Sequence, residues 1–80
     1  MSKVDLRAVL QEIDRFHELN GYAPTVRDIQ HGLGLSSTSI TQNRFMKLRH
    51  MGYIDWVDGI ARTLTITQEG IKYMGGNNND

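Results

Sequence analysis

The chain has 80 residues, enough for one small domain, and it contains no cysteine. Disulfide bonds and thiolate metal sites are therefore excluded, and we expect an intracellular, cytoplasmic setting. Nine Lys and Arg balance nine Asp and Glu, so net charge alone does not indicate a nucleic-acid partner. No apolar run approaches the ~20 residues that span a bilayer, so no membrane partner is expected.

The first predicted element is a helix from about Leu6 to Leu19. Asp5 can cap its start, and Asn20-Gly21 is typical of a helix C-terminus. The apolar residues of this segment recur at the three- and four-residue spacing of one buried stripe: Val9, Leu10, Ile13 and Phe16.

Two more helices follow with few residues between them. Thr25 and Asp28 form a Thr-x-x-Asp helix start, and Gly34 is suited to the left-handed backbone that ends a helix. Ser37 is the expected cap of a third helix, from about Thr38 to Met51, which Gly52 ends. Two capped helices joined by a short glycine turn are typical of a DNA-binding helix-turn-helix.

The third helix has two contrasting faces. Thr41, Phe45 and Leu48 lie at i, i+4 and i+7 and should point into the core. Between residues 29 and 54 there is no Asp or Glu, so this stretch is locally basic. Its cations include Arg44, Lys47 and Arg49. The outward face is expected to carry Ser39, Gln42, Asn43, Lys47 and His50.

Two alternating segments rich in β-formers follow, at 53–57 and 62–66. Asp58-Gly59 between them predicts a type I′ hairpin turn. Thr67 should cap a short last helix to about Met74, weakened by Gly70, and residues 75–80 are expected to form a disordered tail. The predicted fold class is α+β, mainly α: a winged helix-turn-helix with a three-helix bundle, a β-hairpin wing and a short C-terminal helix, in one domain over residues 1–74.

The outward face of the third helix has the chemistry of a major-groove reader. The amides of Gln42 and Asn43 suit the N6/N7 edge of adenine, and Ser39 can bond to several base edges. Ile40 lies at the border of the two faces, where it either presses on a thymine methyl or packs in the core. Arg44 can pair with phosphate or with guanine.

Phosphate contacts are expected at the rim of this surface. The backbone amides near Thr25 and Ser37, at the starts of two helices, can bind phosphate. The hairpin residue Arg62 is expected to touch the DNA backbone or minor groove. The expected DNA backbone contacts are Thr25, Arg27, Arg44, Lys47 and Arg62.

Other functional readings have little support in the sequence. Trp56 is expected to be a packing residue rather than a stacking platform. The three histidines are far apart in sequence and have no cysteine nearby, so no metal site is expected. No nucleophile-elbow, phosphate-loop or zinc-protease motif is present, so we expect neither an enzyme nor a cofactor nor a small-molecule ligand.

The segments Asn20 to Ile29 and Leu33 to Ser37 resemble the DNA-binding domain of LexA, the SOS-response repressor. Leu48 followed by Gly52-Tyr53-Ile54 is similar to the end of that family's recognition helix and its first wing strand. The resemblance covers about residues 4 to 66. It implies a winged helix-turn-helix that represses transcription by binding an inverted-repeat operator as a dimer. The family's base-reading positions fall on Ser37, Ser39, Ile40, Gln42 and Asn43.

The sequence also departs from the family pattern. The family's self-cleaving domain is not within these 80 residues, so self-cleavage and the dimerisation provided by that domain are not carried over. Thr38 stands where the family commonly has proline, and the base-reading residues form their own combination, so the target need not be an SOS box. The segment 67–70 resembles a short sequence that leads into a further helix in many winged-helix regulators. It leads to Ile71, Tyr73 and Met74, which either form a small dimer contact or pack back on the domain.

We therefore predict a small bacterial or phage transcriptional regulator, a repressor, that binds double-stranded DNA sequence-specifically. A homodimer is compatible with this prediction. The alternative is a winged-helix protein-interaction module that docks on a transcription or host factor. Zero net charge, Trp56 and the apolar edge at 51–54 favour that alternative.

Overall fold

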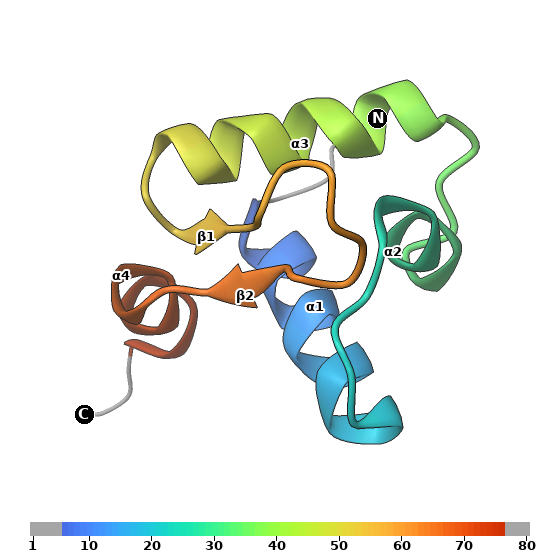
Figure 1. The fold of residues 1–80 in the computed structure, drawn as a ribbon. Helices are drawn as coiled ribbons and strands as arrows, with labels where there is room; N and C mark the ends of the chain where they lie inside the picture. Colours follow the sequence, from blue (N-terminus) through green and yellow to red (C-terminus); the bar gives the residue numbers. More distant parts are fainter. Residues whose placement is uncertain (1–5, 77–80) are drawn as a thin grey trace.

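A computed structural model describes residues 6–76 of the chain, and it confirms the predicted winged helix-turn-helix (Figure 1). Three helices form a bundle: α1 (Leu6–Asn20), α2 (Val26–Gly32) and α3 (Thr38–His50). β1 (Ile54–Asp55) and β2 (Thr65–Ile66) pair as a two-stranded antiparallel sheet. α4 (Gln68–Ile71) then continues into a π-helix, η1 (Lys72–Gly76). Within residues 6–76 no helix is long and apolar enough to cross a membrane.

The first helix begins at Leu6 as predicted and ends one residue later than predicted, at Asn20. Gly21 follows it with a φ of 78°, which suits glycine, and its N–H donates to the carbonyl of His17 at 2.8 Å. The side-chain amide of Asn20 also donates to Phe16 O, so two carbonyls of the last turn have partners. Asp5, the predicted cap, lies outside the described residues.

The helices of the helix-turn-helix begin and end as their local sequences predict. Thr25 Oγ1 accepts from the Asp28 N–H at 3.2 Å, and the Asp28 carboxylate accepts from the Thr25 N–H at 3.0 Å, which completes a capping box. Ser37 Oγ accepts from a first-turn N–H of α3. Gly34 and Gly52 end α2 and α3 with φ of 69° and 84°. These local signals define where each helix starts and stops.

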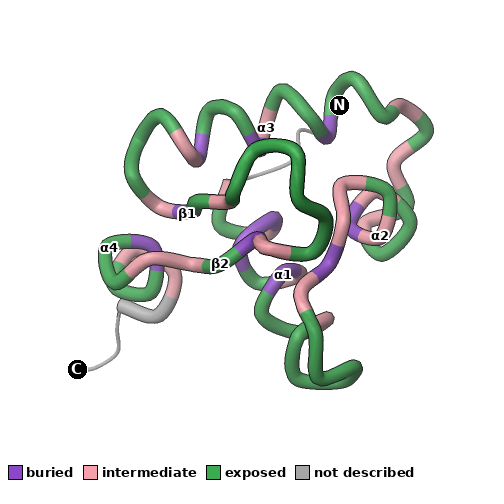
Figure 2. Tube along the Cα trace, viewed as in Figure 1, coloured by how far each residue is buried: buried purple, intermediate pink, exposed green. Residues whose placement is uncertain are grey.

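The core lies where the bundle meets the sheet (Figure 2). Thr41, Phe45 and Leu48 of α3 are buried as predicted, and the Thr41 hydroxyl donates to Ser37 O at 3.2 Å. Because this face of α3 is anchored, its other face must point outward. The buried apolar residues are Val9, Leu10, Ile13, Ile29, Phe45, Leu48, Ile54 and Leu64.

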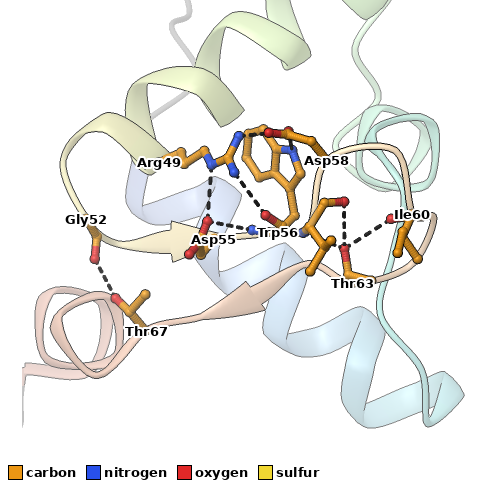
Figure 3. A network of polar contacts seen from close by, with 9 residues as sticks. Arg49, Gly52, Asp55, Trp56, Asp58, Ile60, Thr63 and Thr67 are labelled. Atoms are coloured by element: carbon orange, nitrogen blue, oxygen red, sulfur yellow. Dashed lines mark hydrogen bonds and ion pairs between the residues drawn. The ribbon is translucent and has the colours of Figure 1, made fainter.

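The wing is a hairpin with shorter strands than predicted. Each strand has two residues, and the N–H groups of Trp56 and Val57 bond to side chains instead of to a facing strand. Asp55 Oδ1 accepts from the Trp56 N–H at 2.9 Å (Figure 3). Thr63 Oγ1 accepts from the Val57 N–H at 2.8 Å and donates to Ile60 O at 3.1 Å. The segment between the strands is therefore an ordered loop.

The predicted type I′ turn at Asp58-Gly59 is wrong. A type I′ turn needs positive φ at both central residues, but here only Gly59 has it, at 81°. The N–H of Ile60 still donates to Val57 O, which closes a turn over 57–60. This turn lies within a longer loop between β1 and β2, so the flanking strands do not follow it directly.

The C-terminal segment packs back on the domain. The Tyr73 ring stacks on the Tyr53 ring with centroids 4.6 Å apart, and Met74 packs against the core. Gly70 is buried against the Tyr53 carbonyl, where a Cβ atom would collide. The lack of a side chain at Gly70 therefore permits this close packing, whereas the sequence predicted only that Gly70 weakens the helix. Ile71 remains exposed. Residues 75 and 76, placed in the expected tail, belong to η1, and 77–80 lie outside the described residues.

Candidate nucleic-acid interface

The outward face of α3 presents the side chains that the sequence placed there. Ser39, Gln42, Asn43 and Lys47 are all exposed. Ile40 is 44% exposed, so it does not pack in the core, and its contact with a thymine methyl stays a prediction. No residue of α3 is acidic, so carboxylates from this helix do not oppose an anionic partner.

Ser37, the remaining predicted base contact, has a structural task at the start of α3. Its Oγ accepts from the Ile40 N–H at 3.3 Å, and its carbonyl accepts from the Thr41 hydroxyl. The side chain is half-buried. Its hydroxyl proton is still able to donate, so the expected base contact stays a prediction beside the capping role.

The turn between α2 and α3 holds a pair that the sequence reading missed. Gln30 Oε1 accepts from the Thr38 hydroxyl at 2.7 Å, and Gln30 Nε2 donates to Leu35 O at 3.3 Å. One amide side chain thus contacts both the turn and the first residue of α3. The signal available in the sequence was the hydroxyl at Thr38, where the resembling family commonly has proline.

The predicted phosphate-contacting cations differ in their surroundings. Arg27 on α2 and Lys47 on α3 are exposed, whereas Arg44 is half-buried. Thr25 is less available than expected, because its N–H and hydroxyl are both engaged in the capping box of α2. Its phosphate contact remains a prediction that no contact in the structure tests.

Arg49 does not contribute to the basic face, although it lies in the acid-free stretch. Its guanidinium donates to Asp55 Oδ1 at 3.1 Å, to Asp58 Oδ1 at 3.0 Å and to Trp56 O at 2.9 Å (Figure 3). The bond between Arg49 and Asp58 raises the pKa of the arginine and lowers the pKa of the carboxyl. The wing acids therefore neutralise this cation and hold the wing to the C-terminal part of α3.

Trp56 packs within the same network, as predicted. The Arg49 guanidinium lies 4.0 Å above its ring centroid, and its Nε1 donates to Asp58 Oδ1 at 2.9 Å. The ring centroid of Phe45, a core residue, lies 6.4 Å from that of Trp56. Trp56 therefore joins the wing to the core of the bundle.

Arg62 is exposed, but its guanidinium is likewise bonded within the molecule. It has a φ of 59°, and its Nη1 donates to Ala23 O at 2.9 Å and to Asp28 Oδ2 at 3.1 Å. The guanidinium also lies 4.8 Å from the Tyr22 ring centroid. The pKa of Asp28 is lowered first by the Thr25 N–H and further by Arg62. Arg62 therefore connects the wing to the start of α2. Its guanidinium already has partners within the chain, and its expected contact with DNA stays a prediction.

Comparison with known proteins identifies the family. The LexA DNA binding domain family model matches residues 5–63, from the start of α1 into the wing. A LexA repressor from Limosilactobacillus reuteri is 36% identical over 75 residues, which cover 94% of this chain and 36% of that protein. The transcription regulator LexA of Synechocystis sp. is 39% identical over 57 residues, 68% of this chain and 28% of that protein.

A LexA repressor from Moorella thermoacetica is 45% identical over 49 residues, 61% of this chain and 24% of that protein. The chain thus spans about a third of the length of these relatives, or less. The family match lies within the predicted range of residues 4 to 66 and ends before α4. The chain belongs to the LexA DNA-binding domain family, and it is a winged helix-turn-helix DNA-binding domain.

Proposed function

We propose that this chain binds double-stranded DNA sequence-specifically, with the first turns of α3 in the major groove, and that it represses transcription. One observation carries the proposal: α3 buries Thr41, Phe45 and Leu48 and so holds its polar, acid-free face outward. A helix with this face fits a major groove ~12 Å wide and can bond to base edges there. Repression is the activity given in the names of its LexA repressor relatives.

The surface divides into two kinds of contact. Ser39, Ile40, Gln42 and Asn43 read bases, with Ser37 beside them at the helix start. Arg27, Arg44 and Lys47 pair with phosphates, which sets the position of the domain and contributes most of the salt dependence. The activity is binding rather than catalysis, and it takes place in the bacterial cytoplasm, where the DNA is. A palindromic operator would be bound by two copies of the chain.

Selection of bound DNA from a random pool identifies the site, and Gln42→Ala then tests how it is read. We expect this variant to lose ~1–3 kcal/mol of binding free energy on the selected site and to relax specificity at one position. Gln11→Ala removes the same side chain from an exposed position of α1 and should bind as wild type. Unchanged discrimination between sites by Gln42→Ala would show that α3 does not read bases through this residue.

A protein-interaction module is the second candidate, and one surface favours it. Met46 on α3 and Ile60 on the wing are 50% and 61% exposed and line the same hollow in the surface. Exposed apolar side chains near each other are characteristic of protein interfaces. Gel shifts across salt concentrations separate the two functions, because phosphate binding strengthens at low salt. Absence of DNA binding at about 50 mM salt would support the protein partner.

A further inference from the structure

Besides the packing of their buried residues, α2 and α3 are joined by a hydrogen bond between one side chain of each helix. Gln30 lies in α2 and is half-buried, and Thr38 is the first residue of α3. The Thr38 hydroxyl donates to Gln30 Oε1 at 2.7 Å, which is a normal distance for an O–H···O hydrogen bond. The Gln30 amide nitrogen donates to Leu35 O at 3.3 Å. Both ends of the Gln30 amide are therefore engaged, which leaves its orientation little freedom.

The contact lies directly beside the residues proposed to read DNA. Ser39 follows Thr38, and Gln42 lies about one helical turn further along α3. Base-edge hydrogen bonds form over donor–acceptor distances of roughly 2.7–3.2 Å, so a shift of about half an ångström in the first turn weakens them. A restraint at residue 38 therefore acts on the placement of this turn relative to α2.

Other interactions near the turn restrain different parts of it. The Ser37 cap orders the backbone of α3 itself. The N–H groups of Gly34 and Leu35 bond to carbonyls of α2, and these bonds complete the end of that helix. Gln30 and Thr38 instead connect the two helices through their side chains. Where the resembling family commonly has proline, Thr38 supplies the hydroxyl that makes this connection.

We propose that Gln30 and Thr38 are positioning residues that set the first turn of α3 and thereby increase discrimination between DNA sites. They act through Ser39, Gln42 and Asn43 and need no contact with DNA of their own. This inference rests on the proposed function, because it concerns how the same surface reads its site. It predicts that loss of the contact weakens binding to the selected site more than binding to unrelated DNA.

The experiment compares dissociation constants for the selected site and for a scrambled duplex of the same length. Gln30→Met and Thr38→Val each remove one partner with little change of shape, and Thr38→Ser keeps the hydroxyl as the matched control. We expect the specificity ratio to fall about 3- to 10-fold in each of the first two variants, the effect of one hydrogen bond. Thr38→Ser should keep the wild-type ratio, and all three should keep the salt dependence on scrambled DNA.

The double variant Gln30→Met/Thr38→Val separates positioning from a general loss of stability. When two residues act through one contact, the effects of substituting them do not add. The specificity ratio of the double variant should therefore fall no further than that of the more strongly affected single variant. Thermal unfolding of each variant shows whether it is folded under the conditions of the binding measurements. If one single variant does not fold, the other still tests the inference. Specificity ratios within twofold of wild type, or additive losses, would overturn the inference. Wild-type protein that does not discriminate between sites would instead overturn the proposed function.

Discussion

Lys47→Ala tests how the basic face of α3 contributes to DNA affinity. Lys47 is exposed on the outward face of α3, two residues before Arg49, so it points away from the side on which the wing acids neutralise Arg49. The proposed binding surface has three cations per protomer for phosphate: Arg27, Arg44 and Lys47. Replacing Lys47 should remove one phosphate contact while the buried face of α3 stays intact.

The size of the effect follows from counterion release. Each phosphate contact contributes about −0.9 to the slope of log K against log salt concentration. Three contacts predict a slope of about −2.7 per protomer, and two predict about −1.8. Between about 50 and 200 mM salt, affinity should therefore fall roughly 40-fold for wild type and roughly 12-fold for Lys47→Ala. Both specific and scrambled DNA should show the change, because phosphate is present in every sequence.

Fluorescence anisotropy with labelled duplexes at several salt concentrations gives both slopes. Lys72→Ala is the matched control, since it removes the same charge from the segment after α4, away from α3 (Figure 1). This control should keep the wild-type slope. A Lys47→Ala slope equal to wild type, or an equal change in Lys72→Ala, would refute the assignment of Lys47 to phosphate.

Three further predictions concern the stability of the fold and the attachment of the wing. Gly70→Ala should lower the free energy of unfolding by about 1–3 kcal/mol, because a Cβ atom there meets a backbone carbonyl. In the control variant Gly32→Ala, the Cβ atom meets only a flexible glutamate side chain, so the loss of stability should be smaller. Chemical denaturation measures both, and equal losses would contradict the packing explanation. In the folded chain the pKa of Asp28 is below its ordinary value of 3.8. The ionised carboxylate therefore stabilises the fold at pH values above the unfolded-state pKa, and this stabilisation is lost as the pH falls through the lower folded-state pKa. Asp28→Asn should therefore show a shallower loss of stability below about pH 4 than wild type, and parallel acid-unfolding curves would contradict this. Arg49→Leu should release the wing and shift the emission of Trp56, the single tryptophan of the chain, and an unchanged spectrum would mean that other contacts hold the wing.

The sequence predicted well those features whose causes are local. The caps at Thr25 and Ser37 depend on groups three residues apart, and both are present. The two faces of α3 follow from helical periodicity, which places Thr41, Phe45 and Leu48 inward. The hairpin was predicted less well, because side chains from the loop bond to backbone groups that were expected to form a ladder.

The sequence by itself determined the order of helices, their caps and the outward polar face of α3, because these depend on residues within a few positions of one another. Only the tertiary structure decided which charges are available to a partner. Arg62 bonds to groups 34 and 39 residues earlier, and Arg49 bonds to the wing acids. Sequence spacing does not reveal such pairs, because folding alone brings their partners together. The folded chain thereby shows that Arg49 and Arg62 hold the wing, while Lys47 remains exposed on the outward face of α3.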